Sequence, residues 1–286
     1  MQYFEPNFLD EALVLLDRFA GGARVLAGAT RLGPQLRDGA DGVETLLNVK
    51  RVPELRDVHF DGVSLRIGAL VTARELAEDA LVRTHAPLVA LAAATVGARQ
   101  LRCVATIGGN ICSGDPAADL STALLACDAV CCIASIRHGS VETPIDRIFK
   151  PNVSGLPSGE LLVAVRIPAG GACAAYQKMT TRRGFEMALV AVAASLSFEA
   201  GHVRRARIAL AGAAPTVLRA AGAEAALAGR QLTRASADAA ARVAADADAQ
   251  PLDDHRASAR YRRHLVATLT RRALLAAGAP ERGAAA

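Results

Sequence analysis

The stretch VATIGGNICSGDPAADLS, from Val104 to Ser121, constrains the fold of this chain more than any other part of its sequence. It places two adjacent glycines, small hydroxyl residues and an Asp-Pro pair after an apolar run. A glycine has no Cβ, so a ligand or another backbone can come close to it. A second stretch, VLAGATRL at residues 25–32, shares this pattern. The two stretches predict backbone segments cleared of side chains for a common ligand.

The chemistry of the two stretches favours an anion as that ligand. We interpret both as glycine-bearing turns with exposed N–H groups, because consecutive free amides form a concave anion site. Thr30, Thr106 and Ser113 add hydroxyl donors, and two such turns suit a diphosphate better than a single phosphate. For one turn alone, a tight connection without a ligand is the more common explanation. Neither stretch has the G-x-G-x-x-G order of a Rossmann site or the order of a Walker loop, so both of these sites are disfavoured.

Composition limits the classes of protein that need to be considered. The chain has 286 residues, of which 52% are hydrophobic and 21% charged, as expected for a globular protein of two or three domains. The net charge is +5, but the arginines are spread along the chain, so no nucleic-acid partner is predicted. The six cysteines form no C-x-x-C pair, which favours free thiols and predicts no metal or iron–sulfur site.

The sequence also predicts no membrane span. No apolar segment approaches the roughly 20 residues that cross a bilayer without charges or strong amphipathic patterning. The first residues, MQYFEPNFLDEALVLL, carry acids where a signal peptide needs a basic flank. We therefore expect a cytoplasmic protein.

The order of the predicted elements indicates the α+β class. Strands and helices are mixed without the regular alternation of a doubly wound sheet. Residues 58–71 predict a hairpin followed by a helix with a Thr72–Glu75 capping box, and residues 173–211 predict a meander of three strands. Asn7 is the expected N-cap of the first helix, and Asp115 that of a helix running from Pro116 to about Ala126.

Three segments, in their order and separations, resemble one family. VLAGATRL, TIGGNICSGDPAADL and YQKMTTRRGFEMALVAVAASL look like the FAD-binding medium subunit of the molybdenum hydroxylases, the family of xanthine dehydrogenase, carbon monoxide dehydrogenase and 4-hydroxybenzoyl-CoA reductase. The resemblance spans about residues 1–275, and TIGGN followed by PAADL is its most specific part. It implies an FAD-binding domain of the vanillyl-alcohol-oxidase type at 1–170, with subdomains at about 1–55 and 56–170. A C-terminal domain of antiparallel sheet with helices would follow at 171–280, and a tail at 281–286.

The resemblance also implies a set of FAD-binding residues. The diphosphate would lie between the two glycine stretches, Lys178 and Asp119 fall on a basic and an acidic position near the cofactor, and Leu162 lies in a strand beside the flavin ring. Taken alone, Asp119 and Lys178 would more often be solvated side chains. No catalytic residue and no metal ligand is implied. The implied FAD-binding residues are Val25, Leu26, Ala27, Gly28, Ala29, Thr30, Arg31, Leu32, Val96, Ala105, Thr106, Ile107, Gly108, Gly109, Asn110, Ser113, Asp119, Leu162 and Lys178.

The function implied by the resemblance is electron transfer. In this family a molybdopterin-binding large subunit oxidises the substrate, and a small subunit passes electrons through [2Fe–2S] clusters to FAD on the medium subunit. The resemblance implies a dimer of such heterotrimers and an external acceptor such as NAD or a quinone. Two alternatives stay open: a stand-alone FAD oxidoreductase, and a flavin-free assembly module. The module is favoured by Ala29 and Arg31, which stand where many relatives carry a glycine and an acid.

Overall fold

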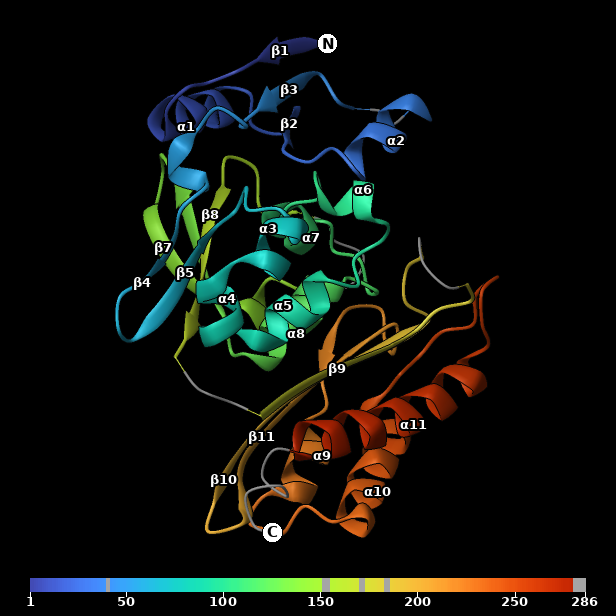
Figure 1. Cartoon of the computed structure of the whole chain (residues 1–286). Helices are drawn as coiled ribbons and strands as arrows, with labels where there is room; N and C mark the ends of the chain where they lie inside the picture. The colour runs from blue at the N-terminus through green and yellow to red at the C-terminus, as the bar shows by residue number, and fades with distance from the viewer. Residues whose placement is uncertain (40–41, 151–154, 170–172, 183–185, 280–286) are drawn as a thin grey trace.

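Three sheets organise the chain in a computed structural model, which describes residues 1–39, 42–150, 155–169, 173–182 and 186–279. Figure 1 shows the first two sheets in the N-terminal part of the molecule and the third, with the last helices, in a separate C-terminal part. Strands and helices are mixed as expected of the α+β class. The predicted tail at 281–286 lies outside the described residues.

A small parallel sheet begins the chain. Its strands, in the order β1-β3-β2, are β1 (Gln2–Phe4), β2 (Ala23–Leu26) and β3 (Thr45–Asn48), and the helices nearest in sequence are α1 (Leu9–Arg18) and α2 (Leu32–Arg37). The central strand β3 is buried along its length. The predicted cap at Asn7 is wrong: Phe8 is the N-cap, and Asn7 instead donates its backbone N–H to the Glu11 carboxylate at 2.9 Å.

A five-stranded antiparallel sheet forms the centre of the N-terminal part. The predicted hairpin is confirmed: β4 (Val58–Phe60) pairs with β5 (Ser64–Gly68), and the Asp61 carboxylate accepts the Val63 and Ser64 amides in the turn. The sheet order is β4-β5-β8-β6-β7. The remaining strands are β8 (Leu161–Pro168), β6 (Val130–Ser135) and β7 (Gly139–Pro144).

Short helices pack beside this sheet. The Thr72–Glu75 capping box is confirmed at the start of α3. The predicted start of the last of these helices is wrong: α8 begins at Asp119, because Asp115 and Pro116 form a turn in which the Asp115 carboxylate accepts the Ala117 amide at 2.8 Å. The helices are α3 (Ala73–Glu78), α4 (Ala80–His85), α5 (Pro87–Ala93), α6 (Arg99–Arg102), α7 (Ile107–Cys112) and α8 (Asp119–Ala126).

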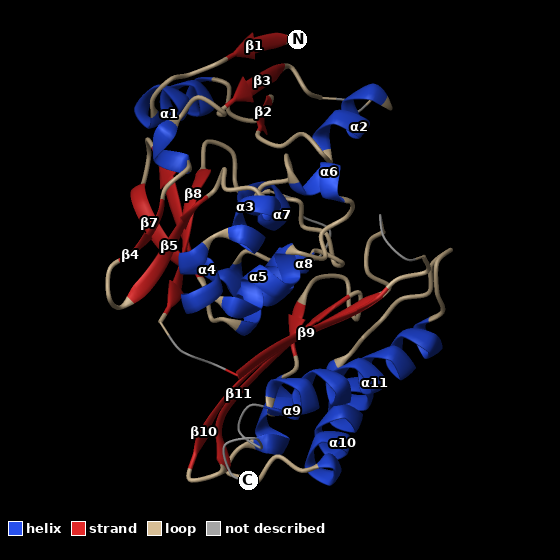
Figure 2. Ribbon diagram, viewed as in Figure 1, coloured by secondary structure: helices blue, strands red, loops and turns tan. Residues whose placement is uncertain are grey.

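The C-terminal part is an antiparallel sheet with helices on one face (Figure 2). The predicted meander is confirmed, and a short fourth strand extends the sheet to the order β12-β11-β10-β9. The strands are β9 (Cys173–Met179), β10 (Val190–Glu199), β11 (His202–Ala211) and β12 (Leu218–Arg219). The helices are α9 (Ala221–Leu227), α10 (Arg234–Val243) and α11 (Ala259–Ala277).

The two faces of this sheet pack against different partners because side chains alternate along a strand. On β10, Val190, Val192 and Leu196 join the core under the C-terminal helices. Ala191 and Ala193 belong instead to the core of the N-terminal part, which includes residues of α5 and α8. The run VAVAAS is therefore apolar on both faces, and the alanines allow the N-terminal helices to approach closely.

A direct backbone contact brings the small sheet against the N-terminal core. Gly28 follows β2 and lies on the chain before α7: a Cβ on Gly28 would stand 2.0 Å from the Val104 carbonyl oxygen. No rotamer change can relieve this overlap, since both groups belong to the backbone. Glycine at position 28 is thus a packing requirement as well as an opening for a ligand.

Replacing Gly28 with alanine is expected to destabilise the chain by about 3 kcal/mol or more, because the backbones must separate. Gly33→Ala is the matched control, since a Cβ at this position in α2 would meet only Ala29 Cβ at 4.0 Å. The control should leave the stability equal or raise it by about 0.5–1 kcal/mol, as alanine favours a helix. Urea denaturation of both variants measures the difference, and equal stabilities would contradict the contact.

Candidate cofactor site

A cavity of about 430 Å³ lies between the small sheet and the N-terminal core. One wall is the segment from β2 to α2, which contains Gly28. A second wall comes from α7 and the residue that follows it, Ser113, and a third from residues 155–162, which lead into β8. Apolar side chains such as Leu16, Leu55 and Leu70 also line it. Its size lies within the range of pockets that bind small molecules and cofactors.

The first wall has the free backbone donors that the sequence predicted. Within the described part of the chain, the amides of Gly28, Ala29, Thr30 and Arg31 have no hydrogen-bond acceptor. The Thr30 hydroxyl is likewise unpaired there. Ala29 has φ +56, the left-handed region that favours glycine, so the alanine keeps the turn that a glycine would form. This wall is a concave surface of N–H donors that suits an anion.

The second wall differs from the prediction of an open turn. The two glycines lie in the first turn of α7, and its amides have partners: Gly108 donates to the Ala69 carbonyl at 2.9 Å and Gly109 to the Thr106 hydroxyl at 3.1 Å. Thr106 is the N-cap of the helix, which explains why the segment winds up. A Cβ on Gly108 would meet Ala69 at 2.9 Å, so this glycine serves close packing.

An ion pair connects the two glycine segments. Arg31 Nη1 lies 2.6 Å from Asp115 Oδ2, and the side chains are 48% and 15% exposed. Asp115 is held in place, since its amide donates to the Ser113 hydroxyl at 3.3 Å. The arginine that departs from the family pattern is thus partly neutralised by a nearby acid, and it still lines the cavity.

The third wall was not predicted from the sequence. The segment GLPSGE, residues 155–160, lines the cavity between the other two walls. Gly155 and Gly159 have φ +86 and +85, so both occupy left-handed turn positions. The Gly-x-Pro-x-Gly spacing is the sequence signal that could have marked this segment as a turn beside a ligand.

A second polar cluster lies where the N-terminal part meets the C-terminal sheet. Lys178 Nζ on β9 donates to Asp119 Oδ2 on α8 at 2.8 Å and to the Thr95 carbonyl at 3.1 Å. Tyr176 donates its hydroxyl to the other Asp119 oxygen at 2.6 Å. The Lys178 and Asp119 side chains are each only 8% exposed, so the pair is buried.

Burial governs the ionisation of this cluster. Burial raises the pKa of the Asp119 carboxyl above its usual value, and the adjacent Lys178 ammonium opposes that rise. Burial and the Asp119 charge together raise the pKa of Tyr176 well above its usual value, so this phenol stays protonated and can donate its hydrogen bond. The cluster therefore joins the N-terminal part to the C-terminal sheet through hydrogen bonds that are shielded from water.

The structure brings most of the predicted site residues into one cavity. Those that line it are Val25, Ala27, Gly28, Ala29, Thr30, Arg31, Leu32, Thr106, Gly108, Gly109, Ser113 and Leu162. Leu26, Ala105, Ile107 and Asn110 belong to the same segments but do not line the cavity; the Asn110 amide oxygen instead accepts the Ser121 backbone N–H at 3.0 Å. Of the remaining three, Asp119 and Lys178 form the buried pair, and Val96 follows Thr95, whose carbonyl accepts a hydrogen bond from Lys178.

The structure gives little support for a reactive thiol or a metal site. Cys112 lines the cavity, but burial raises the pKa of its thiol to about 12, so it stays a neutral thiol. Five cysteines carry free thiols: Cys103, Cys112, Cys127, Cys131 and Cys132. Of these, Cys103 is exposed. Among the described residues no group of three or more His, Cys, Asp or Glu side chains could hold a metal ion, and no helix could cross a bilayer.

These observations define the class of protein. Free amides, a threonine hydroxyl and an arginine converge on a cavity that glycines keep open, and such a donor set fits the diphosphate of a dinucleotide cofactor. The cavity continues along apolar walls, which suit the uncharged parts of such a cofactor. The chain is thus a cofactor-binding protein without a Rossmann fold.

Comparison with known proteins gives the family. Residues 1–170 match the family described as the FAD binding domain in molybdopterin dehydrogenase, and residues 174–277 match the CO dehydrogenase flavoprotein C-terminal domain. The chain is 32% identical to the carbon monoxide dehydrogenase medium chain of Hydrogenophaga pseudoflava over 97% of both chains. It is also 32% identical to the xanthine dehydrogenase FAD-binding subunit of Escherichia coli O157:H7, over 88% of this chain and 87% of that one.

Solved structures agree with these matches. A carbon monoxide dehydrogenase chain from Hydrogenophaga pseudoflava superposes with a TM-score of 0.93 at 33% identity, over 98% of this chain and 97% of that one. A chain of quinoline 2-oxidoreductase from Pseudomonas putida 86 gives 0.90 at 28% identity, over 97% and 96%. The chain therefore belongs to the family of FAD-binding medium subunits of the molybdenum hydroxylases, as its motifs predicted, and is the flavoprotein subunit of an oxidoreductase.

The buried pair makes a testable prediction about stability. Asp119→Asn leaves the Lys178 charge buried without its partner, and Lys178→Met does the same to Asp119, so each should cost about 3–5 kcal/mol. The variant with both substitutions should lose less free energy of unfolding than the two single losses added together, because neither buried charge remains. Urea denaturation of all four proteins gives the coupling energy.

The exposed pair between Arg166 and Glu142 is the control. Its atoms approach to 2.5 Å, but its side chains are 41% and 54% exposed. The same cycle with Arg166→Met and Glu142→Gln should give a coupling energy of less than about 1 kcal/mol. If the losses at Asp119 and Lys178 also simply add, the two side chains act independently and the buried link is refuted.

Proposed function

We propose that this chain is the electron-transfer subunit of a molybdenum-containing hydroxylase or dehydrogenase. It would receive electrons from [2Fe–2S] clusters of a partner subunit and pass them through FAD to an external acceptor. The single observation that carries the proposal is the cavity in which free amides of the first glycine segment face α7, in a chain that belongs to this family. When bound, FAD supplies the capacity to accept electrons and to release them to the acceptor.

The first glycine segment would bind the diphosphate of FAD. The amides of Gly28 to Arg31 would donate to its oxygens, with hydroxyls of Thr30 and Thr106 beside them. Arg31 adds a positive charge, and a charge-assisted hydrogen bond of this kind contributes about 1.5–3 kcal/mol. The Arg31–Asp115 pair would keep this guanidinium at the cavity in the absence of the cofactor. Val25, Leu26, Ala27, Ala29, Leu32 and the α7 residues predicted from the sequence would complete this end of the site.

The buried cluster would hold the flavin end. Lys178 places an ammonium group next to the C-terminal sheet, where it would attract negative charge on the cofactor, and Asp119 fixes its position. Val96 and Leu162 would provide apolar surface near the ring. We infer no side chain that acts as a general base, because electron transfer needs binding, orientation and exclusion of water rather than proton abstraction by this chain.

The proposed partners follow from the same family. A molybdopterin-binding large subunit and a [2Fe–2S] small subunit would complete a heterotrimer, which would form a dimer, and the acceptor would be NAD, a quinone or another oxidant. Relatives named as medium chains support a multi-subunit complex. The free thiols support a reducing, cytoplasmic location.

We also propose the domain division. An FAD-binding domain of the vanillyl-alcohol-oxidase type would occupy residues 1–170, with subdomains at about 1–55 and 56–170, and the C-terminal domain residues 171–280. The separate three-stranded and five-stranded sheets support the two subdomains. The end of β8 at Pro168 and the start of β9 at Cys173 support the main boundary, which falls within residues that the structure does not describe.

Purification of the tagged chain from its native host tests the proposal. The expected complex contains two further subunits, one with molybdopterin and one with [2Fe–2S] clusters, together with one FAD per copy of this chain, released by denaturation and identified by mass. The chain expressed alone should bind FAD without showing iron–sulfur absorbance.

Two outcomes would favour the alternatives. FAD in a chain that purifies without partners and turns over a substrate would favour a stand-alone oxidoreductase. A folded, colourless chain that takes up no added FAD would refute the flavin site itself.

A further inference from the structure

The face of the C-terminal sheet that meets the N-terminal part changes character along its strands. Near the buried cluster it carries alanines: Ala193 on β10 lies opposite Ala209 on β11. Further along the same face, Ser195 is opposite Arg207 and Ser197 is opposite Arg205. The alanine rows pack against the N-terminal helices, so the serine and arginine rows mark the place where this packing stops.

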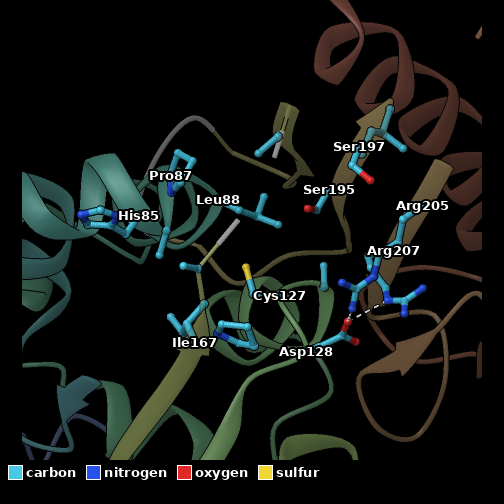
Figure 3. Close-up of a pocket in the computed structure, with 16 residues that line it drawn as sticks. His85, Pro87, Leu88, Cys127, Asp128, Ile167, Ser195, Ser197, Arg205 and Arg207 are labelled. Atoms are coloured by element: carbon cyan, nitrogen blue, oxygen red, sulfur yellow. Dashed lines mark hydrogen bonds and ion pairs between the residues drawn. The ribbon is translucent and has the colours of Figure 1, made fainter. Parts of the chain in front are cut away.

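A second cavity, of about 140 Å³, opens where the packing stops (Figure 3). Its volume corresponds to roughly five water molecules at about 30 Å³ each. Figure 3 shows the serine and arginine side chains on one wall and Pro87, Leu88 and Ile167 on the facing walls. The wall from the C-terminal sheet is therefore polar. The walls from the N-terminal part combine these apolar side chains with His85, Cys127 and Asp128.

The polar wall offers hydrogen-bond donors without partners. Within the part of the chain that the structure describes, the Ser195 and Ser197 hydroxyls form no hydrogen bond with protein atoms. The Arg205 side chain is 54% exposed, and its only protein partner there is the Asp128 carboxylate. Two serine hydroxyls and one side of a guanidinium group are thus available to a ligand.

The charges around the cavity favour an anion. Asp128 takes hydrogen bonds from Arg205, from Arg207 Nε at 2.8 Å and from Arg219 Nη1 at 2.5 Å. Glu224 is the other acid of the network and lies 2.8 Å from Arg219 Nε. Although burial raises the pKa of Asp128, its arginine partners lower it overall, so Asp128 is ionised. Three guanidinium groups face two carboxylates, which leaves one positive charge in excess.

Cys127 does not add a negative charge to the cavity. It lines the wall beside Asp128, but burial raises the pKa of its thiol to about 12. The excess positive charge is therefore not cancelled from this side. An anion with a small apolar body matches the polar wall, the apolar walls and the charge.

We propose that this cavity is a binding site for a small monocarboxylate of about four carbons, with its carboxylate against Arg205, Ser195 and Ser197 and its apolar tail against Leu88 and Ile167. Because the walls come from both parts of the chain, the bound carboxylate also holds the two parts together. The site is separate from the cavity with the glycine segments and does not depend on the proposed cofactor role.

Isothermal titration calorimetry of the full chain with butyrate at low ionic strength tests the site, with neutral butyramide as the matched probe. Butyrate is expected to bind saturably and to raise the melting temperature, since it binds only the folded chain. Butyramide should bind at least about tenfold more weakly, because it cannot form the charge-assisted bond. Screening by added salt should weaken butyrate binding.

Variants distinguish a specific site from a hydrated gap. Arg205→Gln should reduce butyrate affinity to that of butyramide, whereas Arg204→Gln should leave it unchanged. Arg204 is the adjacent residue of β11, is 70% exposed and does not line the cavity. Ser195→Leu, which fills the cavity without changing the charge, should abolish binding in a chain that still melts cooperatively.

Any one of several results would overturn the proposal. These are no saturable butyrate binding to the unaltered chain, equal binding of butyrate and butyramide, or unchanged affinity in both Arg205→Gln and Ser195→Leu. Loss of binding in Arg204→Gln to the same degree as in Arg205→Gln would show only a general charge effect, and would also refute the site.

Discussion

The close approach of backbone to backbone at glycines is the constraint on which the rest of the N-terminal part depends. Gly28 lies on the Val104 carbonyl and Gly108 on Ala69, while Gly68 approaches the Leu55 carbonyl so closely that a Cβ would stand 2.3 Å from it. These contacts fix the distances between the small sheet, α7 and the larger sheet. The cavity is the space that remains between elements held at these distances. The amides of Gly28 to Arg31 face it without an acceptor among the described residues, because they lie in a turn that pairs with no strand and belongs to no helix.

A second constraint joins the N-terminal part to the C-terminal sheet. Small side chains on β10 and β11 permit close packing, and the buried pair of Lys178 and Asp119 fixes the position of β9 relative to α8. Arg262 supports the start of β10, where its guanidinium binds the Leu189 carbonyl at 2.5 Å and the Asp254 carboxylate at 2.7 Å. Burying the Lys178–Asp119 pair costs desolvation free energy, so the pair serves to fix the position of β9 relative to α8 rather than to raise the stability of the fold.

Local signals in the sequence were sufficient for much of the fold. The hairpin at Asp61, the capping box at Thr72 and the meander after Cys173 depend on neighbours in the chain, and all three form. The caps at Asn7 and Asp115 were misplaced, because each has an alternative local hydrogen bond that the sequence does not rank. The glycines of α7 indicated a turn, but the approach of Ala69 requires glycine inside a helix, and such a tertiary contact leaves no local signal.

In the candidate site, too, the features set by neighbours in the chain could be predicted and those set by tertiary contacts could not. Its first glycine segment could be recognised from composition and order, whereas the pairing of Lys178 with Asp119 joins residues 59 positions apart. Nothing in the local sequence of either residue predicts that contact; only the resemblance to the family placed them near one cofactor. The segment at 155–160 has the sequence pattern of a turn, but no residue type in it indicated a ligand, because it contributes backbone and shape to the cavity rather than charge.

A crystal structure of the chain with bound FAD would show whether the first glycine segment binds the diphosphate. We expect the diphosphate oxygens to lie within hydrogen-bond distance of the amides of Gly28 to Arg31, in the cavity between that segment and α7. A diphosphate bound elsewhere, with these amides facing only water, would contradict it.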